Sequence, residues 1–341
     1  MSSKMRDSRF ELLRLVAILM VVLSHFSLYG QRFRLQMNPS FLTRIGTDLF
    51  MPYGKVGVSL FVLITGYFLG LKKIGMFFAF KQGWKIWTET IFYTLISFIC
   101  FTIFEKGFNI SLFVKSVVPV TTGLYWFVTM YVILIFLLPF INTTLGNLSK
   151  ENFKLLIYVL LVINSMIPIL SLNYEFMLST PYLIGAYIRK YGINIKHKLL
   201  YLCVVLLLFH FLVMVLNIYD HGWAITNGIL PIVVATLIFL FVVEMKPFES
   251  KFINKLATTS FAGYLVTEYP PVRNLLWKII GFENVHNSFL ADLYGLLAII
   301  VFLYVGVFIV DVFRQEIFAI LRVNRFPNCI YKVIVKGNSK M

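Results

Sequence analysis

The chain has 341 residues, of which 59% are hydrophobic and only 13% are charged, and its formal net charge is +16. A soluble globular chain carries roughly 25% charged and about 45–50% apolar residues. The composition therefore excludes a soluble enzyme, a disordered chain and a DNA-binding domain, and it predicts a polytopic membrane protein.

Ten apolar stretches approach the length that crosses a bilayer, which is about 17–25 residues for a helix. The ninth is the weakest candidate because it is rich in hydroxyl side chains and ends at Pro270 and Pro271, which helix interiors rarely tolerate. We therefore predict an all-α fold, a bundle of about ten transmembrane helices. In chain order the stretches cover about 10–30, 55–71, 84–104, 124–145, 154–171, 174–189, 198–218, 223–244, 256–270 and 290–313.

The first stretch contains three ionisable residues, Glu11, Arg14 and His25. Such residues are costly inside a membrane and suggest a functional site by default. Arg14 and His25 lie within about 20° of one helix face and roughly 16 Å apart along the axis, and Glu11 is spaced to pair with Arg14. Two alternatives stay open: an ion pair that only fixes the depth of the helix, and a histidine that only satisfies a neighbouring carbonyl.

The Lys and Arg residues are distributed unevenly between alternate loops. With the N-terminus placed inside, the inner segments hold 22 of them and the outer segments hold 8. This bias predicts that both termini are cytoplasmic, and it explains the net charge without a nucleic-acid partner. We divide the chain into a membrane domain, 1–316, and a basic cytoplasmic tail, 317–341, which we expect to lie along the inner membrane surface.

The cysteines and histidines indicate no metal centre. The 3 Cys residues are widely separated, and the 5 His residues do not show the paired spacing of metal ligands. We therefore expect no bound metal. The sequence does not indicate an oligomeric state.

Several segments together resemble the acyltransferase 3 family of integral membrane acyltransferases. The first is Glu11-Leu-Leu-Arg14 followed by His25, and the second is the Gly-Val-Ser-Leu-Phe…Thr-Gly-Tyr-Phe run over 57–68. Weaker similarities lie at Tyr125-Trp126-Phe127 with Pro139, at 182–187 and at 261–268. The resemblance covers about residues 9–316 and departs from the family where Thr267 and Glu268 replace a common His.

The resemblance implies transfer of an acyl group, usually acetyl, from cytoplasmic acyl-CoA to a hydroxyl of an extracytoplasmic glycan or lipid-linked sugar. It also implies a multi-pass protein of a bacterial plasma membrane. In this reading His25 is the catalytic base or is itself acylated, and Arg14 and Glu11 support it. Acetyl-CoA would be the donor substrate, and its phosphates would meet a cationic cluster of Arg14, Lys72, Lys73, Lys81 and Lys85.

We expect three further residues, Glu268, Trp126 and Tyr264, on the acceptor side. The lysines are also explained as ordinary cytoplasmic topology signals, and Glu268 as a carboxylate at the outer interface. The competing function is a transporter or exporter of a glycan or small solute, although the sequence shows no inverted repeat of the kind that many carriers have.

Overall fold

The computed structural model describes residues 6–30, 48–105, 107–170, 178–217, 225–280 and 289–331. Within these segments the chain is helical and contains no strand, which confirms the all-α prediction. The principal helices are α1 (Ser8–His25), α4 (Tyr53–Leu69), α5 (Met76–Glu105), α6 (Ile110–Val117), α7 (Trp126–Asn147), α8 (Lys150–Leu170), α9 (Ser179–Tyr191), α10 (Lys198–Asn217), α12 (Ile229–Glu244), α13 (Lys251–Ala257), α14 (Ser260–Glu268), α15 (Pro270–Ile280), α16 (Phe289–Val301) and α17 (Phe308–Ile320).

Membrane-spanning character is clear in part of the bundle. Among the described residues, 5 helices are long and apolar enough to cross a membrane, and α4 and α12 are shorter apolar helices. The structure thus supports a polytopic membrane protein, while the count of about ten spans stays a prediction. The long segments are Ser8–Tyr29, Met76–Phe104, Trp126–Asn147, Lys198–Asn217 and Gly295–Ile320.

The ninth predicted stretch, 256–270, is not one continuous helix. Helix α13 ends at Ala257, and α14 begins at Ser260. Between them the Thr259 hydroxyl donates to the Leu256 carbonyl at 2.8 Å. Helix α14 ends at Glu268 because Tyr269 is extended, as the residue before a proline prefers to be. Pro270 then opens α15, a position at which proline costs no hydrogen bond.

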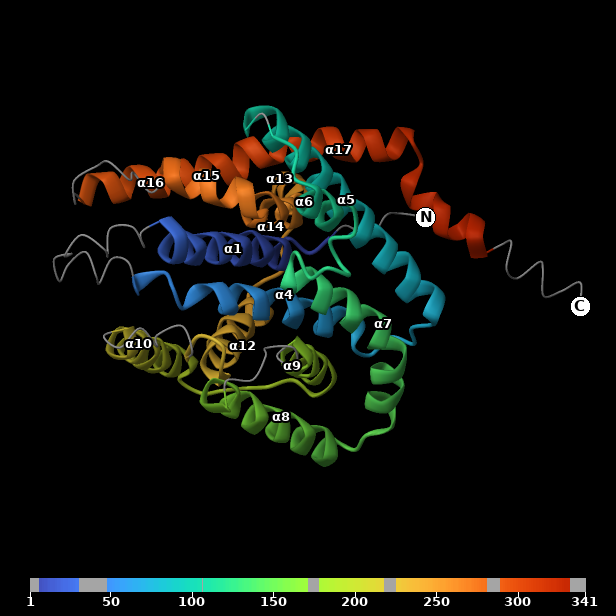
Figure 1. The fold of residues 1–341 in the computed structure, drawn as a ribbon. Coiled ribbons are helices and arrows are strands. Elements are labelled where there is room, and N and C mark those ends of the chain that lie inside the picture. Colours follow the sequence, from blue (N-terminus) through green and yellow to red (C-terminus); the bar gives the residue numbers. More distant parts are fainter. Residues whose placement is uncertain are drawn as a thin grey trace, which may run out of the picture.

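Helices α1 and α4 lie in the middle of the molecule (Figure 1). Helices α15, α16 and α17 cover them on one side, and α8, α9, α10 and α12 cover them on the other (Figure 1). The start of α1 and the end of α17 point toward the same end of the bundle (Figure 1). The arrangement places the polar residues of α1 at the centre of the fold.

The start of α1 is anchored by polar contacts. The Ser8 hydroxyl donates to Asn254 Oδ1 at 2.8 Å, and Arg9 Nη1 donates to the Val243 carbonyl at 3.0 Å. Asp7 caps the helix by accepting from the Arg9 backbone N–H. The hydrogen bonds from Arg9 hold the pKa of the Asp7 carboxyl below its usual range. These contacts fix the start of α1 against the end of α12 and against α13.

The first part of the predicted tail packs against α5. A left-handed residue, Arg322, turns the chain after α17. The Phe326 ring then stacks on Trp84 with ring centroids 4.7 Å apart, and Trp84 Nε1 donates to the Val323 carbonyl at 3.0 Å. Residues 332–341 lie outside the described residues, so the membrane-surface placement of the tail stays a prediction.

Close packing of α4 on α9 depends on glycine. A Cβ atom added at Gly66 would lie 2.0 Å from the Tyr182 carbonyl oxygen, and one at Gly185 would lie 2.3 Å from the Leu63 carbonyl oxygen. Both obstacles are backbone atoms, which cannot rotate away. Small residues are the usual means by which membrane helices approach this closely.

We expect Gly66→Ala to destabilise the protein by about 1–3 kcal/mol, because the added methyl group forces α4 and α9 apart. Thermal unfolding in detergent should show a lower midpoint than wild type. Gly75→Ala is the matched control, since nothing lies within 4 Å of a Cβ atom at that position. Equal midpoints for the two variants would contradict the packing role.

Candidate active site

A cavity of about 910 Å³ runs along α1 toward the centre of the bundle. Its volume falls in the range of about 300–1,000 Å³ that is typical of small-molecule sites. The outer end carries basic side chains, all at least partly exposed, and the inner end is mostly apolar. The basic residues are Arg6, Arg9, Lys72, Lys85 and Arg189, and those of the inner end are Ile18, Val21, Val58, Phe61, Phe127 and Tyr264.

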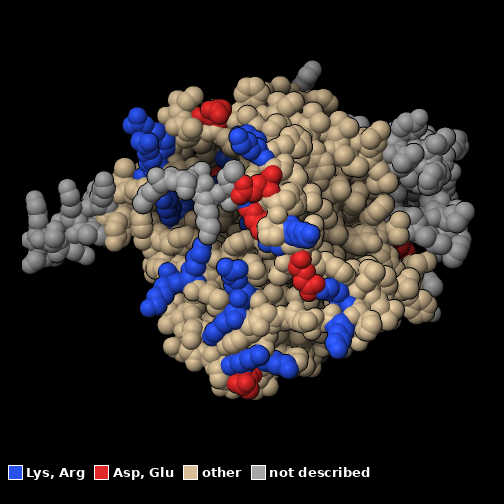
Figure 2. Space-filling model, turned by 180° about the vertical axis from the view of Figure 1, so that it is seen from behind, with Lys and Arg blue, Asp and Glu red and all other residues tan. Residues whose placement is uncertain are grey.

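The molecular surface reflects this charge distribution. Lys and Arg side chains gather over the left and centre of the face in Figure 2. The basic side of that view is the side on which α1 begins (Figure 1). An anionic ligand would therefore meet the cavity at its basic end.

The predicted cationic cluster is brought together only in part. Arg14, Lys72 and Lys85 line the cavity, whereas Lys73 and Lys81 are exposed and do not line it. The reason for the exclusion of Lys81 is geometric: the α5 residues that line the cavity are Gln82, Lys85, Ile86 and Glu89, and at about 100° per residue Lys81 falls outside the face that they share.

The predicted pairing of Glu11 with Arg14 is present. Arg14 Nη1 lies 2.5 Å from Glu11 Oε1, and both residues line the cavity. The Glu11 side chain is buried, while that of Arg14 is 31% exposed. Arg14 therefore offers guanidinium N–H groups to the cavity in addition to neutralising Glu11.

His25 and Glu268 meet at the ends of α1 and α14. His25 Nδ1 lies 2.9 Å from Glu268 Oε1, and the two side chains are 13% and 9% exposed. The contact has the distance of an ion pair, but neither atom makes a well-aligned hydrogen bond within the described segments. Glu268 is thus the carboxylate that faces the imidazole, and orienting His25 is one of the two roles predicted for it from the sequence.

Two further basic residues complete this cluster, and sequence reasoning missed both. Arg273 Nη1 lies 3.6 Å from Glu268 Oε2 and 3.3 Å from the Tyr29 hydroxyl. Lys55 is buried, and its ammonium lies 3.5 Å from the centroid of the Trp126 ring. The sequence contains one signal for Lys55, its position at the start of the apolar stretch 55–71, where a charged residue is costly.

The cavity ends one helical turn from the His25–Glu268 pair. Val21 and Tyr264 line its inner end, and each stands four residues before a member of the pair on the same helix. Four residues of helix rise about 6 Å. Of the three residues predicted on the acceptor side, Glu268 contacts His25, Trp126 contacts Lys55, and Tyr264 lines the cavity.

A family model described as an acyltransferase domain matches residues 7–312. The chain belongs to the acyltransferase 3 family. Neither the curated proteins nor the solved structures contained a significant match to it. Family membership supports a membrane acyltransferase and leaves the acyl group, the donor and the acceptor to be proposed from the site.

The departure from the common acyltransferase 3 pattern near the end of α14 has a structural consequence. The Thr267 hydroxyl donates to the Gly263 carbonyl at 2.9 Å, within its own helix. Glu268, the next residue, supplies the side chain that reaches the imidazole. Over the residues that the structure describes, no three His, Cys, Asp or Glu side chains group as metal ligands.

Proposed function

We propose that this membrane acyltransferase transfers an acetyl group from cytoplasmic acetyl-CoA to a hydroxyl of an extracytoplasmic glycan or lipid-linked sugar. The observation that carries the proposal is a cavity with a basic outer end that reaches within one helical turn of the His25–Glu268 pair. The phosphates of CoA suit the basic end, because lysine and arginine bind phosphate through charge-assisted hydrogen bonds.

The proposed chemistry follows from the orientation of His25. In this proposal Nδ1, which lies 2.9 Å from the Glu268 carboxylate, holds the proton, and Nε2 acts as the base. In direct transfer, the acceptor oxygen attacks the thioester carbonyl while its proton moves to Nε2, and the departing thiolate then takes that proton. In the alternative route, Nε2 attacks the thioester carbonyl and CoA leaves as a thiolate; the acceptor oxygen then takes the acetyl group from Nε2, and its proton neutralises the released thiolate.

The nature of the acyl group is inferred from the inner end of the cavity. The side chains there are Ile18, Val21, Val58, Phe61, Phe127 and Tyr264, none of which is charged. A neutral acetyl group would be accommodated at low cost, whereas the carboxylate of a succinyl group would be buried without a partner among these residues. We therefore favour acetyl over succinyl.

The orientation of the protein is part of the proposal. We place the basic end of the cavity in the cytoplasm of a bacterial cell, in agreement with the distribution of Lys and Arg between the loops. The acceptor then reaches His25 from the opposite side of the plasma membrane. A carrier is the competing function, but a cavity that ends beside a histidine–carboxylate pair is explained more directly by acyl transfer.

Binding of acetyl-CoA to purified protein tests the donor assignment. We expect a joint Lys72→Ala and Lys85→Ala variant to bind acetyl-CoA at least about tenfold more weakly, since each lost contact to a charged phosphate is worth roughly 1.5–3 kcal/mol. A joint Lys73→Ala and Lys81→Ala variant removes equal charge outside the cavity and should bind normally. Equal losses of acetyl-CoA affinity in both variants would show that the lysines act through their overall charge and not through contacts in the cavity. If the wild-type protein does not bind acetyl-CoA, the assignment of acetyl-CoA as the donor is wrong.

A further inference from the structure

Three buried polar groups without aligned hydrogen bonds lie along one wall of the cavity. Glu89 Oε1, Ser260 Oγ and the Tyr264 hydroxyl have no hydrogen-bond partner of normal geometry in the described part of the chain. Each of these residues is only 5% exposed, and each lines the cavity. Buried polar groups are almost always satisfied in native proteins, so three such groups in the lining of one cavity mark where a bound molecule would find hydrogen-bond partners.

The order of the three groups follows the length of the cavity. Glu89 stands one turn beyond the basic Lys85 on α5, and Ser260 and Tyr264 are one turn apart on α14. Tyr264 also precedes Glu268, the partner of His25, by one turn. On each helix the step is one turn, about 6 Å, and on α14 the steps from Ser260 to Tyr264 to Glu268 lead toward the proposed catalytic pair.

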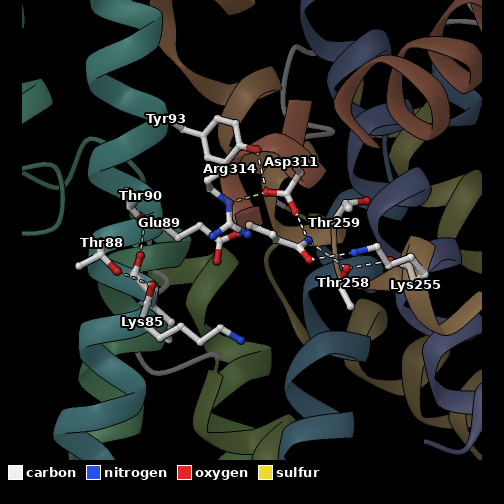
Figure 3. Close-up of polar contacts among 12 residues, drawn as sticks. Lys85, Thr88, Glu89, Thr90, Tyr93, Lys255, Thr258, Thr259, Asp311 and Arg314 are labelled. Atoms are coloured by element: carbon white, nitrogen blue, oxygen red, sulfur yellow. Dashed lines mark hydrogen bonds and ion pairs between the residues drawn. The ribbon is translucent and has the colours of Figure 1, made fainter. Parts of the chain in front are cut away.

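Glu89 is held in place by a polar network between α5 and α17 (Figure 3). Arg314 Nη2 lies 3.2 Å from Glu89 Oε1, while Arg314 Nε donates to Asp311 Oδ1 at 2.6 Å. Asp311 also accepts from the Tyr93 hydroxyl at 2.7 Å and from Gln315 Nε2 at 2.7 Å. Asp311 therefore balances the charge of Arg314, and Glu89 keeps acceptor capacity for another donor.

The Tyr264 hydroxyl occupies a different environment at the inner end. It faces the backbone N–H of Phe127, in the first turn of α7, without a hydrogen bond of normal geometry. Both groups can donate to an oxygen placed between them. A carbonyl oxygen at this position would gain electrostatic stabilisation as it becomes negative during acyl transfer.

We propose that Glu89, Ser260 and Tyr264 form a binding track for the pantetheine arm of the acyl donor, a proposal that rests on the proposed function. Glu89 accepts from an amide N–H of the arm, and Ser260 bonds a second amide. Tyr264 donates to the thioester carbonyl beside His25. Hydrogen bonds from the track would orient the uncharged, flexible pantetheine arm beyond the phosphates. Orientation of the arm is what positions the thioester beside His25.

The experiment compares CoA with 3′-phosphoadenosine 5′-diphosphate, which has the phosphates of CoA but lacks the arm. We expect Ser260→Ala and Glu89→Gln each to weaken CoA binding about fivefold, the effect of one net hydrogen bond, and to leave binding of the nucleotide unchanged. Glu89→Gln keeps the shape of the side chain, and Asp311 still balances Arg314. Ser59→Ala is the matched control, because Ser59 Oγ is equally buried and unpartnered but does not line the cavity.

Tyr264→Phe tests the inner end of the track. Its loss should appear as a lower kcat for acetyl transfer with little change in CoA binding, since CoA itself has no thioester carbonyl. Unchanged CoA affinity in both Ser260→Ala and Glu89→Gln would overturn the track, as would equal losses for CoA and the nucleotide. If wild type binds neither molecule, the proposed function fails instead, so the two failures are distinguishable.

Discussion

His25→Gln is expected to abolish acyl transfer while leaving the protein inserted in the membrane at normal levels. Glutamine keeps the size of the side chain and part of its hydrogen bonding, but it can neither take a proton near neutral pH nor be acylated. Removal of a general base typically costs roughly 10²–10⁴ in rate, so acylation of surface glycans in cells should fall to background.

The control measurements separate a catalytic role from a structural one. His210→Gln changes a histidine whose ring nitrogens lie 2.8 and 3.1 Å from the carbonyl oxygens of Leu206 and Leu49 and which does not line the cavity. This variant should retain glycan acylation. Near-normal acylation by His25→Gln would mean that the imidazole only satisfies its neighbours, and the carrier hypothesis would gain support.

The sequence was sufficient to predict the fold class and the polar residues of the first span. Hydropathy identified most of the helices, because a long apolar run in a chain of this composition has few alternatives to a membrane helix. It did not predict that 256–270 breaks into α13 and α14, since the break depends on local hydroxyl-to-carbonyl bonds around Thr259. Such bonds compete with the helix only where tertiary packing favours them.

The predicted site was incomplete for a different reason. Glu11 and Arg14 are three residues apart, so their pairing is a local property of one helix. The contacts of Glu268 with His25 and of Arg273 with Glu268 join helices that are far apart in the sequence. No periodicity within one helix can predict which residues of distant helices face each other. For the same reason the sequence did not predict that only two of the four lysines line the cavity.

Glu268→Gln should lower kcat strongly while leaving the affinity for acetyl-CoA nearly unchanged. The substitution keeps the shape of the side chain but removes the charge that orients His25 and stabilises the imidazolium formed during transfer. Loss of an orienting carboxylate beside a catalytic histidine reduces kcat by up to about 10⁴ in the best-studied hydrolases, and we expect a reduction of at least about 10² here. The acetyl-CoA dissociation constant should stay within about twofold of the wild-type value, because Glu268 does not line the cavity.

Glu244→Gln provides the matched control, since Glu244 forms an ion pair with Lys198 but its side chain is 47% exposed. Exposed ion pairs contribute about 0–1 kcal/mol, so this variant should retain wild-type kcat and stability. A parallel loss of donor affinity and thermal stability in Glu268→Gln would show that the carboxylate acts in folding, because the partly buried Arg273 would then lose its charged partner. A fall in kcat alone would instead separate donor binding, which depends on the basic end of the cavity, from proton transfer, which depends on His25 and Glu268 one helical turn beyond its inner end.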